Sequence, residues 1–503
     1  MRSIRSTLTC SCRDRPEVVA LASALCGLAL LVAGCGGGNV ITPTTPPSGP
    51  VTAASTTVVI QLSSTANDEF TAFNMTINSI SLTNKAGVTT TIFNTPTDVG
   101  FIPANGNAAP FATVSVPQDV YTSAAVSVSD VSFSNVSMDS QGEIDFNTDA
   151  YGYTPTPPVV NLATPIAIEG STMGLTLDLQ AAQSGSYTGL GTSQTGYKIN
   201  PTFDLTSFPV TAEATTPQTG KCLSIAAQVT AIDSAAKTMT VTIAGSPRTI
   251  GQSLTIGLNS ATVFQGVASA SSLQAGTLIN MDIALEPDAS YTATRIEVQD
   301  ATTTNVATGQ LIQVDPSFSY ISSSAIEQQG SVLSVQPVGS GDPYVYSGYT
   351  KFQTSALFPD LSALPFNALF NSSTLAAGQM VSVGSLSISL TGGSYTLPTS
   401  ITLVPQTIDA VVNRISTSGS YTVYAAQLAP YDLIVQMNSP ASHAVDTIVP
   451  NANTVYVYIE PSPTLFTSTP LGIGDTFRFH GLLFNDGGVL RMICDQVNDG
   501  VAQ

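Results

Sequence analysis

Imidazole side chains are the first candidates for chemistry, because histidine exchanges protons near neutral pH more readily than other side chains. The sequence holds two of them, His443 and His480. Neither belongs to an HExxH pattern, and His480 lies in the alternating segment 477–481 (FRFHG), which favours a strand. A Gly-x-Ser-x-Gly elbow, a phosphate-binding loop and a GxGxxG turn opening a helix do not occur either. We therefore expect His480 to be a solvent-facing or hydrogen-bonded strand residue.

Carboxylates could act in pairs as general acid and base, as in glycosidases, but their spacing singles out no pair. The densest group of hard oxygen ligands lies in segment 139–149, where Asp139, Glu143, Asp145 and Asp149 occur. Calcium takes six to eight such oxygens, yet the spacing does not follow an EF-hand loop. We expect a solvated acidic loop here, and a calcium site is the alternative.

Aromatic platforms for sugars would have to be built from tyrosine, because the chain has no tryptophan. Tyrosines spaced two residues apart, such as Tyr344 with Tyr346 and Tyr456 with Tyr458, could take that role. Residues at i and i+2 share one face of a strand. We expect packing in the core or between neighbouring strands at both pairs, with a sugar platform as the alternative.

The N-terminal segment has the composition of an export signal. Four arginines stand within the first 15 residues, and residues 18–34 (VVALASALCGLALLVAG) carry no charge. This stretch is short for a membrane span of about 20 residues and typical of a signal-peptide core. It ends in Val32-Ala33-Gly34-Cys35, which resembles the lipobox of bacterial lipoproteins. By that resemblance residues 1–34 are a lipoprotein signal peptide and Cys35 receives lipid through its thiol; an ordinary signal or an uncleaved anchor helix is the alternative.

Residues 35–55 are rich in Gly, Pro and Thr, uncharged and without periodicity, which predicts a disordered tether. Gly36 stands where an Asp would resemble an inner-membrane retention signal. The resemblance therefore implies an outer-membrane lipoprotein that faces either the periplasm or the cell surface.

The charge balance limits the partners. The chain has 503 residues, with 14 Lys and Arg against 33 Asp and Glu, so the formal net charge is −19. Removal of residues 1–34 takes away four basic and two acidic residues and leaves a net charge of −21. Such a chain cannot neutralise phosphates, which excludes nucleic acid as a partner. No cofactor motif occurs, and no cofactor is expected.

From Thr56 onward the sequence consists of short alternating runs, rich in Val, Ile, Thr and Tyr, separated by Gly, Pro, Asn and Ser. Period-two alternation is the pattern of β-strands, so we predict an all-β protein. Residues 56–212 are expected to form a β-sandwich domain. The order of its runs, from VVIQL at 58–62 to YKINP at 197–201, resembles domain-of-unknown-function family 4382, a family of lipoprotein domains. Residues 213–220 (EATTPQTG) form a linker.

A threefold repeat follows, and small antiparallel β-barrels or sandwiches are expected at residues 221–305, 306–408 and 409–503. Each copy has a Thr-x-aromatic landmark and then a Leu-x-x-Gly landmark. The landmark residues are Thr262, Phe264, Leu273 and Gly276 in copy one, Thr350, Phe352, Leu375 and Gly378 in copy two, and Thr454, Tyr456, Leu471 and Gly474 in copy three. The first copy, which ends in YTATRIEV at 291–298, resembles domain-of-unknown-function family 5666 of exported bacterial proteins. Neither family brings a known activity.

Cys222 and Cys494 are the other two cysteines of the mature chain, at the start of the first repeat and the end of the third. In a compartment that permits disulfides they could form a bond, which would require the outer repeats to fold back on each other. Two separately buried thiols are the alternative.

Copy two contains an insertion. Its Thr and Gly landmarks stand 28 residues apart, against 14 in copy one and 20 in copy three. The added segment 357–370 (LFPDLSALPFNALF) includes Phe358, Leu361, Phe366 and Phe370 and a single charge. Large exposed apolar patches mark interaction sites. We expect this segment either to pack against a neighbouring module or to bind a partner.

Together these patterns predict a lipid-anchored modular β-protein of the bacterial cell envelope. Its expected role is binding or structural, without catalysis and without a ligand that the sequence names. Its expected partners are the membrane, through lipid on Cys35, and an envelope protein or polysaccharide. A carbohydrate-active or otherwise hydrolytic surface protein that uses paired carboxylates is the alternative.

Overall fold

The computed structural model divides the chain into two units, Met1–Thr52 and Ala53–Gln503. The first unit, with Cys35, lies outside the residues that the structure describes. The described residues are 54–499 without 66–69, 102–105, 139–143, 149–156, 189–195, 211–220, 244–251, 299–304, 316–317, 322–325, 330–331, 336–343, 356–357, 359–360, 391–392, 429–431, 438–452 and 467–469.

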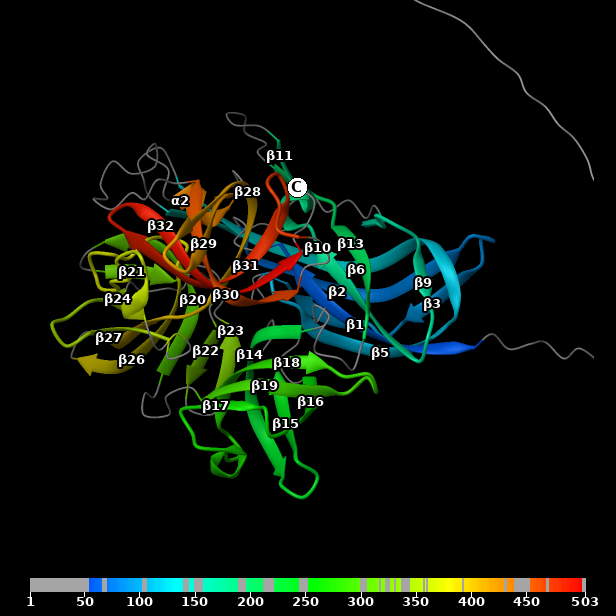
Figure 1. Cartoon of the computed structure of the whole chain (residues 1–503), viewed down its shortest axis with the longest axis horizontal. Coiled ribbons are helices and arrows are strands. Elements are labelled where there is room, and N and C mark those ends of the chain that lie inside the picture. The colour runs from blue at the N-terminus through cyan, green and yellow to red at the C-terminus, as the bar shows by residue number, and fades with distance from the viewer. Residues whose placement is uncertain are drawn as a thin grey trace, which may run out of the picture. The chain divides into compact units, whose positions relative to one another are not determined.

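β-Strands make up almost all of the regular structure, which confirms the predicted all-β fold (Figure 1). Within the described ranges, helical turns are confined to α1 (Ala181–Ser184), α2 (Leu433–Met437) and the 3-10 turns η2 (Ala270–Ser272) and η3 (Leu361–Ala363). A helix with the length and apolar character needed to cross a membrane does not occur among the residues described.

Two sheets form the N-terminal sandwich. The first has the strand order β5-β1-β10-β13-β8, and the second has the order β3-β2-β6-β7, with β4 beside β2 and β9 beside β6. The strands of the first sheet are β1 (Ser55–Ser64), β5 (Ala109–Pro117), β8 (Val159–Asn161), β10 (Thr172–Leu179) and β13 (Thr202–Pro209). The strands of the second are β2 (Phe70–Asn84), β3 (Thr89–Phe93), β4 (Thr97–Gly100), β6 (Asp119–Met138), β7 (Ile144–Thr148) and β9 (Ile166–Ile168). A separate hairpin pairs β11 (Gly185–Thr188) with β12 (Gly196–Ile199).

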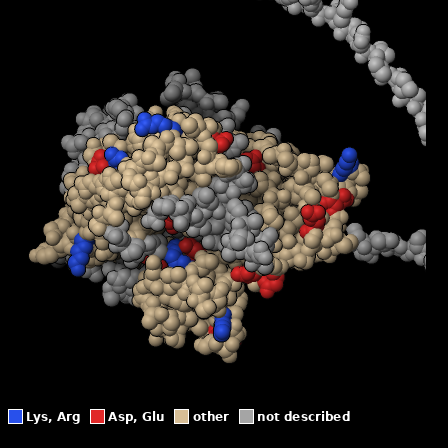
Figure 2. All heavy atoms as spheres, viewed as in Figure 1, with Lys and Arg blue, Asp and Glu red and all other residues tan. Residues whose placement is uncertain are grey.

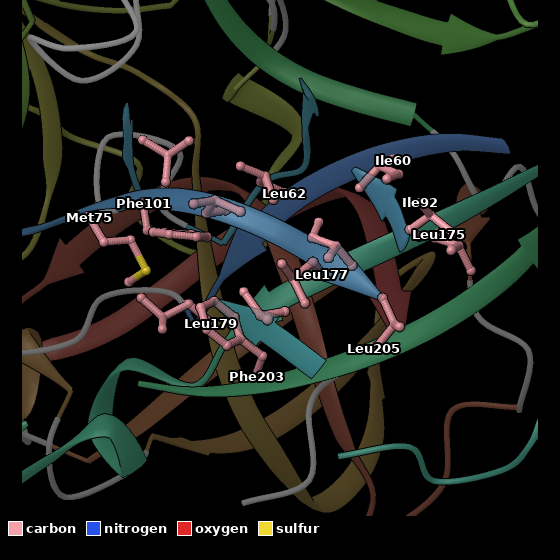
Figure 3. Packing of buried hydrophobic residues seen from close by; sticks show 14 of the residues in the cluster. Ile60, Leu62, Met75, Ile92, Phe101, Leu175, Leu177, Leu179, Phe203 and Leu205 are labelled. Atoms are coloured by element: carbon pink, nitrogen blue, oxygen red, sulfur yellow. The ribbon is translucent and has the colours of Figure 1, made fainter. Parts of the chain in front are cut away.

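The core of this sandwich follows from strand alternation. Val58, Ile60 and Leu62 of β1 project on one side into an apolar cluster that includes Met75 of β2 and Leu177 of β10. Figure 3 shows the close packing of part of this cluster. Burial of these apolar side chains against the second sheet is the main stabilising term of the sandwich.

Strand β1 is also buried on its opposite face. Val59 and Phe208 of β13 lie in the apolar cluster of the first repeat rather than in the sandwich core. The Gln61 amide donates to the Tyr291 hydroxyl of that repeat at 3.3 Å. Gly174 of β10 makes room for the ring of Phe208, because a Cβ there would stand 2.0 Å from Cζ of that ring. The first sheet is therefore covered from both sides.

Repeat 1 is a ring of strands. It consists of β14 (Lys221–Asp233), β15 (Thr238–Ile243), β16 (Gln252–Gly257), β17 (Val263–Gln265), β18 (Leu278–Leu285) and β19 (Tyr291–Val298). The strand order is β16-β15-β14-β18-β19-β17, and β16 and β17 both pair in parallel with β19, which closes the ring.

Repeat 3 is a closed barrel with the same connectivity, in the order β28-β29-β30-β32-β31. Its strands are β28 (Gln406–Ser418), β29 (Tyr421–Leu428), β30 (Thr454–Phe466), β31 (Thr476–Asp486) and β32 (Val489–Asp499). The first strand pairs with the fourth, and the third runs parallel to the fifth. This is the strand order of a five-stranded OB-fold barrel.

Repeat 2 keeps the pairings that define this barrel, because β20 pairs with β26, β26 with β27, and β25 runs parallel to β27. Its strands are β20 (Asn305–Asp315), β21 (Phe318–Ile321), β22 (Ile326–Gln329), β23 (Val332–Val335), β24 (Tyr344–Val345), β25 (Lys351–Thr354), β26 (Met380–Leu390) and β27 (Gly393–Leu403).

The glycine landmark has the same conformation in all three repeats. Gly276, Gly378 and Gly474 have φ angles of +89°, +86° and +92°, in the left-handed region that favours glycine. Each glycine N–H donates to a carbonyl of its repeat's first strand, at 2.7, 2.6 and 2.8 Å respectively. The repeated glycine thus fixes the turn that leads into the fourth strand of each barrel.

The threonine landmark makes the same two hydrogen bonds in repeats 1 and 2. The hydroxyl groups of Thr262 and Thr350 accept from a backbone N–H three residues earlier, and donate to carbonyls of β19 and β27 at 2.8 and 2.9 Å. The third copy differs in its aromatic residue. Phe264 and Phe352 are register partners of the core residues Ile296 and Ile401, whereas Tyr456 pairs with Arg491 on the outside of the barrel.

Candidate functional site

Strand β31 of repeat 3 is buried on both faces, from Phe477 to Asn485. Phe477 and Phe479 point into the barrel core. The alternate residues point outward, and Leu482 and Phe484 belong to a cluster shared with repeat 2. The outer face of this strand is therefore a contact surface between modules, and its polar residues are the first candidates for a site.

Arg478 joins repeat 3 to the N-terminal sandwich. Its Nη2 donates to Oδ1 and Oδ2 of Asp178 at 3.1 Å each, and its Nε donates to Oδ1 of Asp409 at 3.0 Å. All three side chains are buried. Burial by itself lowers the pKa of the Arg478 guanidinium, but the carboxylates of Asp178 and Asp409 raise it by more, so the net shift is upward. The contact is a buried ion triad between distant parts of the sequence.

Asp178 is held by further hydrogen bonds, which its position on β10 makes possible. The Ser63 hydroxyl of β1 donates to its Oδ1, and Nε2 of Gln180 donates to its Oδ2 at 2.6 Å. Asp204 of β13 stands directly opposite it in the sheet and accepts from Nδ2 of Asn161 at 3.1 Å. Burial raises the pKa of the Asp204 carboxyl, and the nearby Asp178 adds to this while Arg478 opposes it.

A second charged group lies on the outer face of repeat 1. Arg295 donates from Nε and Nη2 to the two oxygens of Asp282 at 2.8 and 2.9 Å, and from Nη1 to Oε2 of Glu297 at 3.2 Å. Burial lowers the pKa of Arg295, but Asp282, Glu297 and then Asp495 of repeat 3 raise it by more. The charge of Asp495 in repeat 3 thus acts on Arg295 in repeat 1.

Glu297 has an unusual setting within this group. Burial raises the pKa of its carboxyl, while Arg295 acts in the opposite direction. Its register partners on either side are Gln265 of β17 and Asn280 of β18. The amide oxygens of both are buried and have no hydrogen-bond donor among the described residues. The amide oxygens of Gln265 and Asn280 therefore lie on either side of Glu297, and burial favours the protonated form of its carboxyl.

His480 lies on strand β31 and takes part in a hydrogen bond, which is one of the two settings expected from the sequence. Its ring is buried, and its Nδ1 lies 2.9 Å from Oδ1 of Asp495, which is partly exposed. The second histidine, His443, lies outside the described residues.

The insertion of repeat 2 packs against repeat 3. Phe370 is buried, and Phe358, Leu361 and Phe366 are half-buried in the cluster that the two repeats share. The Phe366 ring lies 4.7 Å from that of Tyr458 and 5.9 Å from that of Phe484. Of the two expectations for this segment, the placement corresponds to packing between modules.

The two cysteines are free thiols in different cores. Cys222 is buried in the cluster of repeat 1 and Cys494 in that of repeat 3. Burial raises the pKa of both thiols. The disulfide bond is not formed in this structure, and the arrangement is that of two separately buried thiols.

The remaining candidate residues fall on undescribed parts of the chain. Asp139, Glu143 and Asp149 of the calcium alternative lie outside the described residues, and Asp145 is described only as part of strand β7. In the ranges that the structure does describe, histidine, cysteine and acidic side chains form no group of three arranged for a metal ion. Figure 2 shows a face on which charged side chains are few and scattered among uncharged ones.

Sequence reasoning missed Arg478 and Arg295 as organising residues. The available signal was an arginine between apolar residues of an alternating strand, in a chain with only 9% charged residues. Alternation places such a residue on the outer face of its strand, but it does not say which distant module covers that face.

The comparisons with known proteins agree with one part of this description. Residues 227–297, within repeat 1, match DUF5666, a domain of unknown function. No curated protein matches the chain. Among solved structures, a glycoside hydrolase of family 32 from Bifidobacterium adolescentis aligns with 88% of this chain and 67% of its own at 9% identity, with a TM-score of 0.10. A TM-score this low does not indicate a shared fold. Repeat 1 is thus the part of the chain that is similar to a known family, the domain of unknown function DUF5666.

Proposed function

We propose that this protein is a lipid-anchored binding or structural component of the bacterial cell envelope, attached to the outer membrane through Cys35. The anchor is supported by the sequence Val32-Ala33-Gly34-Cys35 after an uncharged core, and by the uncharged tether that follows it. Two lipid signals hold a chain stably on a membrane. The resemblance to bacterial lipoproteins implies such an anchor at Cys35. The N-terminal sandwich is proposed to be a lipoprotein domain similar to family 4382.

One observation carries the non-catalytic role. In two groups of the described structure, carboxylates converge on an arginine that lies between them and donates to both. Arg478 stands between Asp178 and Asp409, and Arg295 between Asp282 and Glu297. A glycosidase needs that space for the scissile bond and a water molecule. Arg478 therefore joins two modules and Arg295 joins two strands of repeat 1, and the binding surface is expected elsewhere on the chain.

The anchor is tested by metabolic labelling with radioactive palmitate in a bacterial host. The wild-type chain should be labelled and recovered with the membrane fraction. Cys35→Ser should lose the label and accumulate with its signal peptide uncleaved. The matched control is Cys26→Ser, which removes a thiol of the signal segment and should leave labelling unchanged. Equal labelling of Cys35→Ser and wild type would overturn the anchor.

The binding role is tested with the full chain, purified in a detergent without sugar headgroups and mixed with isolated bacterial cell envelopes. The protein should co-sediment with the envelopes, and no reducing ends should be released from their polysaccharides. Release of reducing ends that disappears in Glu297→Gln would favour the hydrolytic alternative. Failure to sediment would overturn the binding role.

A further inference from the structure

Three polar residues lie side by side on the outer face of repeat 1. Glu297 of β19 is the register partner of Gln265 on β17 and of Asn280 on β18, so the three side chains project from one face of adjacent strands (Figure 1). The alternate residues Ile296 and Met281 fill the barrel core. Three oxygen-bearing side chains are thus gathered on neighbouring strands, which lie about 4.8 Å apart.

The oxygens of these side chains lack hydrogen-bond donors. Oε1 of Gln265 and Oδ1 of Asn280 are buried, and neither accepts from a described residue. Oε2 of Glu297 accepts from Arg295 at 3.2 Å, which leaves Oε1 for another partner. Buried acceptors without a donor are rare and costly. A proton on Glu297, which burial favours, could serve one of the two amide oxygens but not both.

The same face carries more negative than positive charge. One positive charge, on Arg295, is set against two negative charges, on Asp282 and Glu297. Asp495 of repeat 3 also raises the pKa of Arg295, so a third negative charge acts on this group. A cation would offset this excess, and a divalent one would neutralise the four side chains together.

The side of repeat 3 that carries Asp495 also has an acceptor without a donor. His480 projects from the outer face of β31 and lies 2.9 Å from Asp495. Its register partner on β32 is Gln496, which is 9% exposed and has a buried Oε1 that accepts from no described residue. Repeat 3 therefore contributes negative charge and a further buried amide oxygen.

From this arrangement we infer that Gln265, Asn280 and Glu297 form a calcium-binding site. The ion is coordinated by Oε1 of Glu297 and by the two amide oxygens, and water completes its shell of six to eight oxygens. Oxygens on opposite sides of a calcium ion are about 5 Å apart, which matches the spacing of the strands. Asp282 and Asp495 add negative charge without coordinating the ion. A single coordinating carboxylate distinguishes this site from a group of three acidic or histidine side chains.

Ligand chemistry favours calcium over other ions. Carboxylate and amide carbonyl oxygens are hard ligands, whereas copper and zinc prefer thiolate or imidazole. Magnesium requires near-octahedral geometry and gives up its water reluctantly, so three side chains from three strands suit it poorly. Sodium or potassium would leave part of the negative charge without compensation.

Repeat 2 shows that the barrel does not require this group. The same strand positions hold Gln353, Thr402 and Ser382, and Ser382 follows its landmark glycine by four residues, as Asn280 does. Nε2 of Gln353 donates to the Thr402 hydroxyl at 2.9 Å. The group in repeat 2 is therefore uncharged, and its hydroxyls can both donate and accept. In repeat 1 a carboxylate replaces the hydroxyl of Thr402.

The test is calorimetric titration of the full chain with calcium chloride, in detergent and after removal of metal ions with EDTA. One calcium ion should bind at this site, with a dissociation constant of roughly 10⁻⁴–10⁻³ M, the range of extracellular calcium modules. Glu297→Gln should weaken this binding at least tenfold, and Gln265→Met and Asn280→Leu at least threefold each. The matched control is Gln353→Met, at the equivalent position of repeat 2, which should bind calcium like wild type.

Melting curves separate a calcium site from a group with a structural role alone. Calcium should raise the melting temperature of wild type and of Gln353→Met, because it binds the folded chain. Without calcium, Gln265→Met and Asn280→Leu should be at least as stable as wild type, since each removes a buried oxygen that has no donor. These two variants give the answer if Glu297→Gln does not fold.

Three results would overturn the inference. The first is absence of calcium binding by the wild-type chain. The second is calcium binding that Glu297→Gln leaves unchanged, which would place the ion elsewhere, for example in segment 139–149. The third is binding of magnesium or sodium as tight as that of calcium.

Discussion

Asp178 and Asp204 stand directly opposite one another on the antiparallel strands β10 and β13, and the cation that pairs with Asp178 is Arg478, 300 residues further along the chain. Like charges in direct cross-strand positions destabilise a sheet. Within the sandwich, the carboxylate of Asp178 is offset by hydrogen bonds from Ser63 and Gln180, which carry no charge. Docking of repeat 3 supplies the missing positive charge, so the sandwich and the last barrel stabilise each other.

Replacement of Arg478 by methionine should therefore destabilise the chain strongly. Breaking a buried ion pair from one side costs about 3–5 kcal/mol, because the partner charge stays buried without compensation. Chemical denaturation of Arg478→Met should show this loss, and Arg414→Met, at an exposed position on β28, should lie within about 0.5 kcal/mol of wild type. Adding Asp178→Asn to Arg478→Met should recover part of the stability. If the two substitutions are additive, the residues are not coupled.

The setting of Glu297 predicts a dependence of stability on pH. Burial raises the pKa of this carboxyl in the folded state, so the folded chain holds the proton more firmly than the unfolded chain. The associated stability is fully present below the unfolded pKa of about 4.3 and is lost as the pH rises through the folded pKa. Glu297→Gln should remove this loss, since a glutamine keeps an acceptor for Arg295 and gains a donor for Gln265 or Asn280.

The measurement is the free energy of unfolding of wild type and Glu297→Gln between pH 4 and pH 8. The difference should grow in favour of the variant as the pH rises. The control is Glu169→Gln, at an exposed position in the N-terminal sandwich, whose difference from wild type should stay nearly constant. A Glu297→Gln difference that is flat, or that grows toward acid, contradicts the prediction.

The three landmark glycines allow a comparison inside one chain. All three have a positive φ, so alanine is strained at each by about 1–2 kcal/mol. A Cβ at Gly276 or Gly474 would meet open space, whereas one at Gly378 would stand 2.2 Å from Cγ1 of Ile434 of α2. Gly378→Ala should therefore cost a further 1–3 kcal/mol, roughly, for overpacking. Thermal melting of the three variants tests this; equal losses would show that the contact with α2 adds nothing.

Local sequence patterns predicted the parts of this fold that depend on local physics. The alternation in β1 and β31 predicted strands there, and the repeated Gly276, Gly378 and Gly474 form equivalent turns, because both features depend on neighbouring residues. The aromatic residue of the third copy, Tyr456, has a different position from Phe264 and Phe352, and neighbouring residues again explain it. Val455 and Val457 of β30 fill the core there, which turns Tyr456 outward.

Contacts between modules could not be predicted in the same way. A period of two shows that Arg478 and Phe479 lie on opposite faces of β31, but it carries no information on the module that covers the outer face. The partner of Arg478 is Asp178, in another domain, and that of Gln61 is Tyr291. Such pairs depend on the arrangement of whole modules.

The segment inserted in repeat 2 offers the sharpest test of how its modules are held together. Phe370 is 7% exposed and lies in the cluster that repeats 2 and 3 share, while its neighbour Leu369 is 46% exposed. Truncation of a buried phenylalanine costs about 3–5 kcal/mol, because contacts are lost and a cavity remains. Phe370→Ala should therefore lower the melting temperature by several degrees, and Leu369→Ala, one residue away in the same segment, should leave it nearly unchanged.

The triple variant Phe358→Ser, Leu361→Ser, Phe366→Ser should lower the melting temperature as well, since these half-buried residues line the same cluster. If all variants melt like wild type but lose a partner captured by the native chain, the segment is a binding loop instead.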